Sequence, residues 1–253
     1  MRRKWTSLIL FGLITIQFFG CVREQQRIFQ AVAEKTHTAV TPERIQVEEV
    51  QAWYGPRHNA VNERLKQGNT DVLFIGNSIT HDWEGDGKRY WNQYYAHRNA
   101  VNMGFSWDRT QHALWRLDHS DFSNISPKLA IVHIGTNNSN GNDNSAREIA
   151  DGIIAICHKL RTLFPKMKIL LLAIFPREHS PSAQRTKNAE ASLLASRIAD
   201  GRMIHYLDLS GAFLDKDGML SADIMPDYLH PNEEGYRIWA EAMEPKVAEL
   251  LSK

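Results

Sequence analysis

Cysteine is scarce in this sequence, with only Cys21 and Cys157 among 253 residues. Two cysteines cannot build the disulfide framework that holds small secreted domains together, and no disulfide forms if Cys21 is modified. Cys157 falls on the apolar face of a predicted helix, beside Ile153 and Leu160. We expect it to be a buried hydrophobic residue rather than a nucleophile or a metal ligand.

An excess of one charge is also missing. The chain has 30 Lys and Arg against 29 Asp and Glu, a formal net charge of +1, and no long block of like charge. A nucleic-acid-binding surface is therefore not indicated. Internal repeats and low-complexity tracts are absent as well. The length suffices for one α/β domain with a sizeable core.

The first 21 residues differ in character from the rest. A basic start, Arg-Arg-Lys at 2–4, precedes an apolar stretch over 5–20 that is short for a membrane span. This pattern predicts a secretory signal. The Phe-Phe-Gly-Cys sequence at 18–21 resembles a bacterial lipoprotein signal, which predicts lipidation of Cys21 and a tethered protein of the periplasm or cell envelope. A plain cleaved signal or an uncleaved anchor is the alternative.

Residues 22–52 are rich in Gln, Glu, Lys and Thr and are predicted to form a tether or a loosely packed N-terminal arm. The globular domain is expected over 53–253. Within it, Arg57–Lys66 has a helical pattern that Gly68 ends. Five short β-like runs follow and alternate with helical segments; they cover residues 72–75, 100–103, 129–134, 169–175 and 203–209.

Helix starts between these runs are marked by Ser145, Ser182 and Asn232. The third and fourth runs are almost unbroken apolar, as in strands that are covered on both faces. Strand–helix alternation of this kind predicts an α/β fold in which helices cover both faces of a parallel sheet.

Candidate catalytic groups follow three of the predicted strands. Ser78 comes after the first strand, Gly104 after the second and Asn137 after the third. Ligand sites of open parallel sheets lie beyond the carboxyl ends of the strands, where these residues would meet. A serine can attack an acyl group, while a glycine N–H and an asparagine amide can stabilise an oxyanion. Ordinary turn chemistry would also explain each residue alone.

A base for Ser78 has to come from the eleven histidines. His230 is three residues after Asp227, so that the carboxylate can hold the imidazole in one tautomer. The alternative is that Asp227 only forms a turn. His133 lies inside a predicted strand and is expected to be a packed core residue. His81 is too near Ser78 in sequence to reach its Oγ easily.

In this order the motifs resemble those of the GDSL or SGNH hydrolases. They are Gly-Asn-Ser-Ile at 76–79, Asn-Met-Gly at 102–104, Gly-Thr-Asn-Asn at 135–138 and Asp-Tyr-Leu-His-Pro at 227–231. The resemblance runs from about residue 53 to 251. It is closest to the branch that contains the catalytic subunits of intracellular platelet-activating-factor acetylhydrolase.

The resemblance implies a flavodoxin-like three-layer α/β/α sandwich with five parallel strands in the order 2-1-3-4-5. It also implies a serine esterase with the catalytic residues Ser78, His230 and Asp227. The oxyanion would be held by the N–H groups of Ser78 and Gly104 and by the side chain of Asn137. No metal or organic cofactor is needed. Relatives in this branch often dimerise, so the resemblance leaves a homodimer open, while the sequence itself does not determine the oligomeric state.

The acyl pocket implied by the family is lined by three motif neighbours with room for a short acyl group such as acetyl: Ile79, Thr136 and Leu229. Three aromatic residues in or beside the motif loops are candidates for a platform under a sugar ring: Trp83, Trp107 and Tyr228. Packing beneath the loops is the alternative for them. Two departures from the family are Asn77 and Asn138, each in place of an aspartate, which removes charge near the site.

These observations predict an exported acetylesterase that acts on carbohydrate. A lipid-directed acetylhydrolase or lysophospholipase is the alternative enzyme. Outside enzymes, a non-catalytic glycan-binding module on the same scaffold is the third hypothesis, because fold does not fix function.

Overall fold

The computed structural model describes residues 23–252. The predicted signal and its Cys21 lie outside this range, so export and lipidation remain predictions from the sequence. Within residues 23–252, no helix is both long and apolar enough to cross a membrane.

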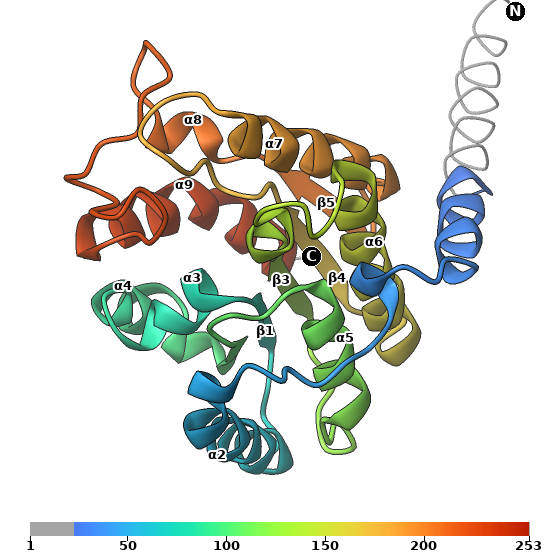
Figure 1. The fold of residues 1–253 in the computed structure, drawn as a ribbon. Coiled ribbons are helices and arrows are strands. Elements are labelled where there is room, and N and C mark those ends of the chain that lie inside the picture. The colour runs from blue at the N-terminus through green and yellow to red at the C-terminus, as the bar shows by residue number, and fades with distance from the viewer. Residues whose placement is uncertain (1–22, 253) are drawn as a thin grey trace, which may run out of the picture.

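The described chain folds around one five-stranded parallel sheet (Figure 1). The strand order is β2-β1-β3-β4-β5, which confirms the predicted topology. The strands are β1 Val72–Gly76, β2 Ala100–Gly104, β3 Leu129–His133, β4 Lys168–Leu172 and β5 Ile204–Leu207. All five predicted strands are present. The last two are shorter than expected, since their apolar sequence continues into the loops.

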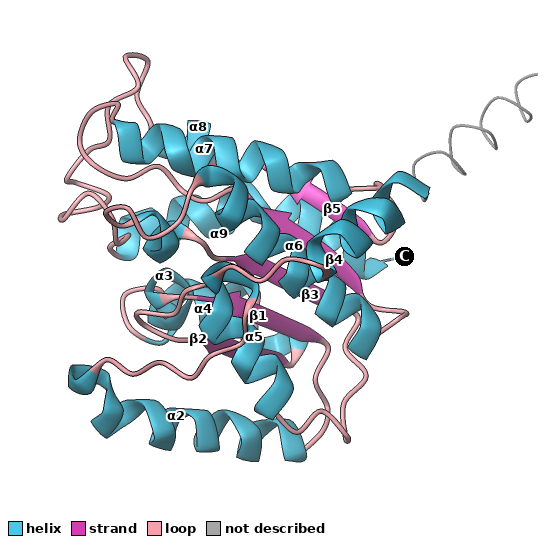
Figure 2. Ribbon diagram, turned by 45° about the vertical axis from the view of Figure 1, so that its right-hand side comes forward, coloured by secondary structure: helices cyan, strands magenta, loops and turns pink. Residues whose placement is uncertain are grey.

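Helices lie on both sides of the sheet, as Figure 2 shows, and each side has its own apolar core. Leu73 and Ile75 face one core, while Val72 and Phe74 face the other, as the alternation of side chains along a strand requires. The first core is covered by α2 Glu48–Lys66, α5 Thr110–His119, α6 Ala146–Leu163 and α7 Ala183–Ala195. The second is covered by α3 Ser78–His81, α4 Lys88–Tyr94, α8 Ser210–Phe213 and α9 Glu233–Ser252.

Short 3-10 helices connect several of these elements: η1 Thr38–Val40, η2 Asp82–Glu84, η3 Ala96–Arg98, η4 Thr136–Ser139 and η5 Ser196–Ile198. The predicted helix starts are confirmed. Ser145 caps α6 in a reciprocal pair with Glu148, and the Ser182 hydroxyl accepts the N–H of Arg185 in α7. The Asn232 side chain accepts an N–H from the first turn of α9. Cys157 is buried and free, as expected.

The prediction of a loosely packed arm over 22–52 is wrong. Residues 23–33 form a helix beside α6 (Figure 1), and Phe29 is only 2% exposed, with its ring 4.6 Å from that of His158. Farther along, Ile45 and Val50 are buried in the first core. The helix predicted from Arg57 begins earlier, at Glu48. The apolar residues of this arm are too widely spaced in the sequence to indicate a core. In the structure Phe29, Ile45 and Val50 are nevertheless all buried in the first core.

Candidate active site

Ser78 lies where the chain leaves β1. The strand ends at Gly76, where a Cβ would come within 2.0 Å of the Thr80 Oγ1 and 2.4 Å of the His133 carbonyl oxygen. Only glycine fits that approach, and the chain turns at once into α3. The Asn77 side chain caps α3 by accepting the N–H of Ile79 at 3.1 Å. The sharp turn therefore places Ser78 at the first position of a short helix, at the carboxyl edge of the sheet.

His230 and Asp227 approach Ser78 from the loop before α9. The Ser78 Oγ lies 2.9 Å from the Nε2 of His230, and the Nδ1 of His230 lies 2.6 Å from a carboxylate oxygen of Asp227. The other carboxylate oxygen accepts the backbone N–H groups of Leu229 and His230. Burial opposes ionisation of Asp227, but these hydrogen bonds outweigh it and hold the pKa of Asp227 below its usual range.

A cavity of about 380 Å³ opens beside Ser78 and His230. Its other lining residues are Ser106, Trp107, Asn137, Asn140 and Leu229. The structure thus brings Asn137, Trp107 and Leu229 to the site, as the sequence predicts. Ser106 and Asn140 were not predicted to lie there.

Gly104 does not have the predicted role. Its N–H donates to the Asn102 side chain at 2.8 Å, and its carbonyl accepts the Arg57 Nε at 2.9 Å, so both backbone groups are already bonded. A Cβ at this position would come within 2.3 Å of the His81 nitrogen. Gly104 therefore allows β2 to end tightly against α3, and it is not a lining residue of the cavity.

The loop after β2, residues 105–109, reaches the cavity instead. Its Trp107 has a left-handed backbone, with φ of 71°, and a side chain that is 58% exposed. The next residue, Asp108, is fully buried and pairs with Arg116 through contacts of 2.6 and 3.2 Å. The Arg116 guanidinium lies over the rings of Phe105 and Tyr54. This buried ion pair fixes the loop to α5 beneath Trp107.

Asn137 is oriented by the same loop, because its Nδ2 donates one hydrogen to the Asp108 carbonyl at 3.0 Å. The amide group has a second hydrogen that stays available. Burial raises the pKa of the Asp108 carboxyl to about 6, although the Arg116 charge opposes that shift. Near neutral pH the pair is ionised, and the loop and Asn137 are held together.

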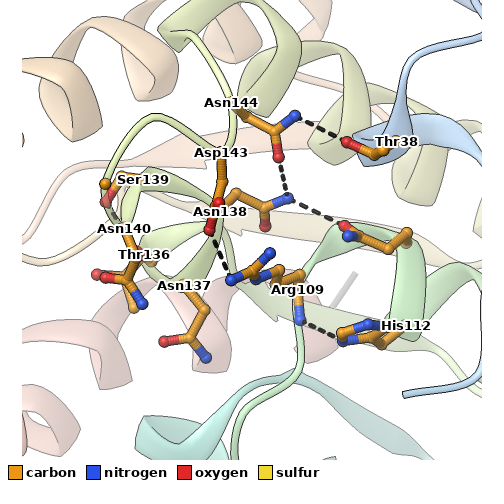
Figure 3. Close-up of polar contacts among 12 residues, drawn as sticks. Thr38, Arg109, His112, Thr136, Asn137, Asn138, Ser139, Asn140, Asp143 and Asn144 are labelled. Carbon is orange, nitrogen blue, oxygen red and sulfur yellow. Dashed lines mark hydrogen bonds and ion pairs between the residues drawn. The ribbon is translucent and has the colours of Figure 1, made fainter. Parts of the chain in front are cut away.

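Asn138 points away from Asn137, as Figure 3 shows, and belongs to a buried network. Its Oδ1 accepts the N–H of Thr110 at 2.9 Å. Its Nδ2 lies within about 3.1 Å of three acceptor oxygens, on Thr110, Gln111 and Asn144. An aspartate could not donate these hydrogen bonds, which accounts for asparagine at this departure from the family motif.

Two residues predicted for the acyl pocket lie elsewhere. Ile79 and Thr136 are each 1% exposed and are not among the lining residues, because α3 and η4 turn them into the interior. Trp83 is fully buried, 4.7 Å from the ring of Trp239, so packing explains it. His133 is a buried core residue, as expected, and burial lowers its pKa to about 3.

A serine, an imidazole and a carboxylate hydrogen-bonded in series at the carboxyl edge of a parallel sheet are typical of serine hydrolases. Residues 74–238 match the GDSL-like lipase/acylhydrolase family. The chain is also 33% identical over 198 residues to platelet-activating factor acetylhydrolase IB subunit alpha2 of Homo sapiens, covering 78% of this chain and 84% of the relative. The alpha1 subunit of Rattus norvegicus is 31% identical over 205 residues, with 79% and 84% covered. The chain belongs to the GDSL-like lipase/acylhydrolase family and is a carboxylic ester hydrolase.

Solved structures share the fold at lower sequence identity. A putative platelet activating factor protein from Streptococcus pneumonia has a TM-score of 0.63 and 19% identity, covering 79% of this chain and 97% of that one. A carbohydrate acetylesterase from Sinorhizobium meliloti has a TM-score of 0.55 and 20% identity, with 72% and 99% covered. An acetylxylan esterase from Geobacillus stearothermophilus has 0.58 and 18%, with 71% and 94% covered. These similarities support the sandwich fold.

Proposed function

We propose that the protein removes acetyl groups from carbohydrate esters, with Ser78 as nucleophile, His230 as general base and Asp227 as the group that orients His230. The observation that carries the proposal is the continuous series of contacts from the Ser78 Oγ to His230 at 2.9 Å and from His230 to Asp227 at 2.6 Å. The series borders a cavity that can hold an ester.

In the proposed mechanism the Ser78 Oγ attacks the ester carbonyl carbon while its proton passes to the Nε2 of His230. The tetrahedral oxyanion then collapses, and the departing alcohol takes the proton from His230. Water attacks the acyl-enzyme, again with His230 as base, which releases acetate and restores the Ser78 hydroxyl. Asp227 stabilises the imidazolium formed in both steps.

Three donors are proposed to hold the oxyanion. They are the backbone N–H of Ser78 at the start of α3, the second Nδ2 hydrogen of Asn137, and the backbone N–H of Trp107. The sequence predicted Gly104 as this third donor, but its N–H is already bonded to the Asn102 side chain, so Trp107 is proposed instead. Trp107 lines the cavity, and the buried Asp108 beside it keeps the loop in place. Preorganised hydrogen-bond donors of this kind usually make the largest single contribution to the rate enhancement of an enzyme.

Acetyl is the favoured acyl group because the cavity, about 380 Å³, has to hold both halves of the ester. This is near the lower end of the range for ligand cavities, about 300 to 1,000 Å³. Carbohydrate is the favoured alcohol because Trp107 presents an exposed ring at the cavity. The names of the matched acetylesterases of carbohydrate and xylan agree with this choice.

A lipid-directed acetylhydrolase is the second candidate. The observation in its favour is the 33% identity to a platelet-activating factor acetylhydrolase subunit over most of the chain.

The test is acetate release from acetylated xylan, other acetylated glycans and an acetylated phospholipid under one set of conditions. We expect kcat/KM for a glycan to exceed that for the phospholipid by at least about tenfold, a difference of about 1.4 kcal/mol. The opposite order favours the lipid-directed enzyme. Activity that rises beyond butyrate in a series of p-nitrophenyl esters contradicts the acetyl assignment. Binding of a glycan without turnover of any ester favours the non-catalytic module.

A further inference from the structure

A second serine in the cavity also contacts an imidazole. The Ser106 Oγ lies 2.9 Å from the Nδ1 of His81, and the Ser106 backbone N–H donates to the same nitrogen at 3.3 Å. Ser106 lines the cavity together with Ser78 and His230. The two residues of this pair follow the carboxyl ends of neighbouring strands, β1 and β2.

The hydrogen positions in this contact follow from the two donors. Since the Ser106 N–H points at the Nδ1 of His81, that nitrogen carries a lone pair and the ring proton is on Nε2. The Ser106 hydroxyl must therefore donate its own hydrogen to Nδ1 as well. Its oxygen keeps only lone pairs for other partners. Ser106 thus acts toward the cavity as a hydrogen-bond acceptor.

His81 is held firmly in the orientation that this contact needs. Its backbone N–H donates to the Asn77 carbonyl at 2.8 Å, and its carbonyl accepts the Asn102 amide at 3.0 Å. Its ring packs against Trp53, with 5.6 Å between centroids. Burial, aided by the charge of Arg57, lowers the pKa of His81 to about 4, so the imidazole is neutral near pH 7.

Asn140 complements Ser106 on the cavity wall. Its Oδ1 accepts hydrogen bonds from Arg177 and Gln184, both at 3.0 Å. These two contacts fix the amide so that its Nδ2 is the group left to donate. The cavity therefore presents one acceptor and one donor besides the catalytic groups. A hydroxyl group is both a donor and an acceptor and fits such a pair.

We infer that Ser106, held by His81, accepts a hydrogen bond from a free hydroxyl group on the alcohol half of the ester. The inference rests on the proposed esterase function and narrows its substrate to partly acetylated polyols such as sugars. A glycerophospholipid that is substituted at all three glycerol positions has no such hydroxyl. Without it, the acceptor on Ser106 would be desolvated by substrate and left unpaired.

The experiment compares a matched pair of esters, the monoacetate of trans-1,2-cyclohexanediol and cyclohexyl acetate, which differ by one hydroxyl. We expect the wild-type protein to have the higher kcat/KM for the monoacetate. Ser106→Ala should lower kcat/KM for the monoacetate by about 5- to 10-fold more than for cyclohexyl acetate, as for one neutral hydrogen bond. Ser106→Gly removes the same oxygen and should change the ratio equally.

Ser196→Ala is the control, because Ser196 begins η5, its hydroxyl donates to the Leu193 carbonyl in α7, and it does not line the cavity. It should leave the ratio unchanged. If Ser106→Ala lowers kcat/KM equally for both esters, or for neither, the acceptor role is wrong while the esterase function stands. If the wild-type protein hydrolyses neither ester nor p-nitrophenyl acetate, the proposed function fails and the acceptor role fails with it.

Discussion

Two serines border one cavity, and each lies 2.9 Å from an imidazole nitrogen, yet their surroundings differ. His230 meets Ser78 through Nε2 and holds Asp227 on its other nitrogen. His81 meets Ser106 through Nδ1, and within residues 23–252 no carboxylate hydrogen-bonds to its ring. Burial lowers the pKa of His81 to about 4, which makes it a weak base.

A short distance between a hydroxyl and an imidazole therefore does not by itself identify a nucleophile. The carboxylate beyond His230 stabilises the imidazolium that proton transfer creates, whereas burial destabilises the same cation at His81. One pair is suited to accept a proton, and the other is suited to fix the direction of a hydrogen bond. The following variants test that difference.

Asp227→Asn should have the largest effect on catalysis. The geometry survives but the imidazole loses its orienting charge, and we expect kcat for p-nitrophenyl acetate to fall by about 10⁴. The matched change beside the other pair is Glu84→Gln, which removes the carboxylate charge that acts on His81. It should change kcat by less than about threefold, since this charge is partly exposed. Equal losses in both variants would contradict the comparison.

Asp108→Asn should have the next largest effect, because it breaks the buried pair under the loop of Ser106 and Trp107. An unpaired Arg116 in the interior should lower the free energy of unfolding by about 3–5 kcal/mol. Urea titration at pH 7.5 measures this value. The double variant with Arg116→Met should recover part of the loss. Glu234→Gln, which breaks an exposed ion pair with Arg237, should have a much smaller effect on the free energy of unfolding. Similar losses for Asp108→Asn and Glu234→Gln would show that the buried pair is unimportant.

Acid should destabilise the fold through its neutral histidines. Burial is the main cause that lowers the pKa of His112 to about 4 and that of His133 to about 3, from about 6.5 in the unfolded chain. At a pH between the unfolded-state and folded-state pKa values, the unfolded chain binds more protons than the folded chain. The free energy of unfolding is therefore highest above about pH 6.5 and falls as the pH drops below it. Each histidine contributes at most about 1.4 kcal/mol per pH unit.

Unfolding titrations between pH 7.5 and 4.5 measure the slope. His133→Gln keeps an acceptor for the Phe175 N–H and should flatten the curve. An unchanged slope in this variant would show that His133 does not contribute.

Trp107→Gly should have the smallest effect. A non-glycine residue in a left-handed conformation costs about 1 kcal/mol, and most of this side chain is exposed. We therefore expect a gain in stability of about 1 kcal/mol, read as a rise in Tm of about 2–4 °C. Trp107→Ala is the control, since it removes the ring but keeps the strained Cβ. An equal Tm in both variants would mean that the loop stores no strain.

The placement of the serine, histidine and aspartate in the site could be predicted from the sequence, whereas the role of the predicted glycine donor could not. Ser78 follows a buried strand, and Asp227 and His230 share one turn, so each signal is local. The role of Gly104 is not predictable from its motif, because its N–H is bonded to the Asn102 side chain and its carbonyl accepts a hydrogen bond from Arg57.

The contact between Ser106 and His81 has no local sequence signal, because it joins two loops that only the register between β1 and β2 brings together. In that register Gly76 pairs with Gly104, so the loops that follow the two strands start side by side. The N-terminal arm was misjudged for a similar reason, since its few apolar residues are buried against distant helices.

The most direct test of the central claim is labelling with a fluorophosphonate, followed by peptide mass spectrometry to locate the adduct. The cavity holds two serines with imidazole contacts, so the label separates nucleophile from hydrogen-bond acceptor. We predict an adduct on Ser78, no labelling of Ser78→Ala, and labelling of Ser106→Ala at Ser78. An adduct on Ser106, or labelling of Ser78→Ala at the wild-type level, would contradict the account.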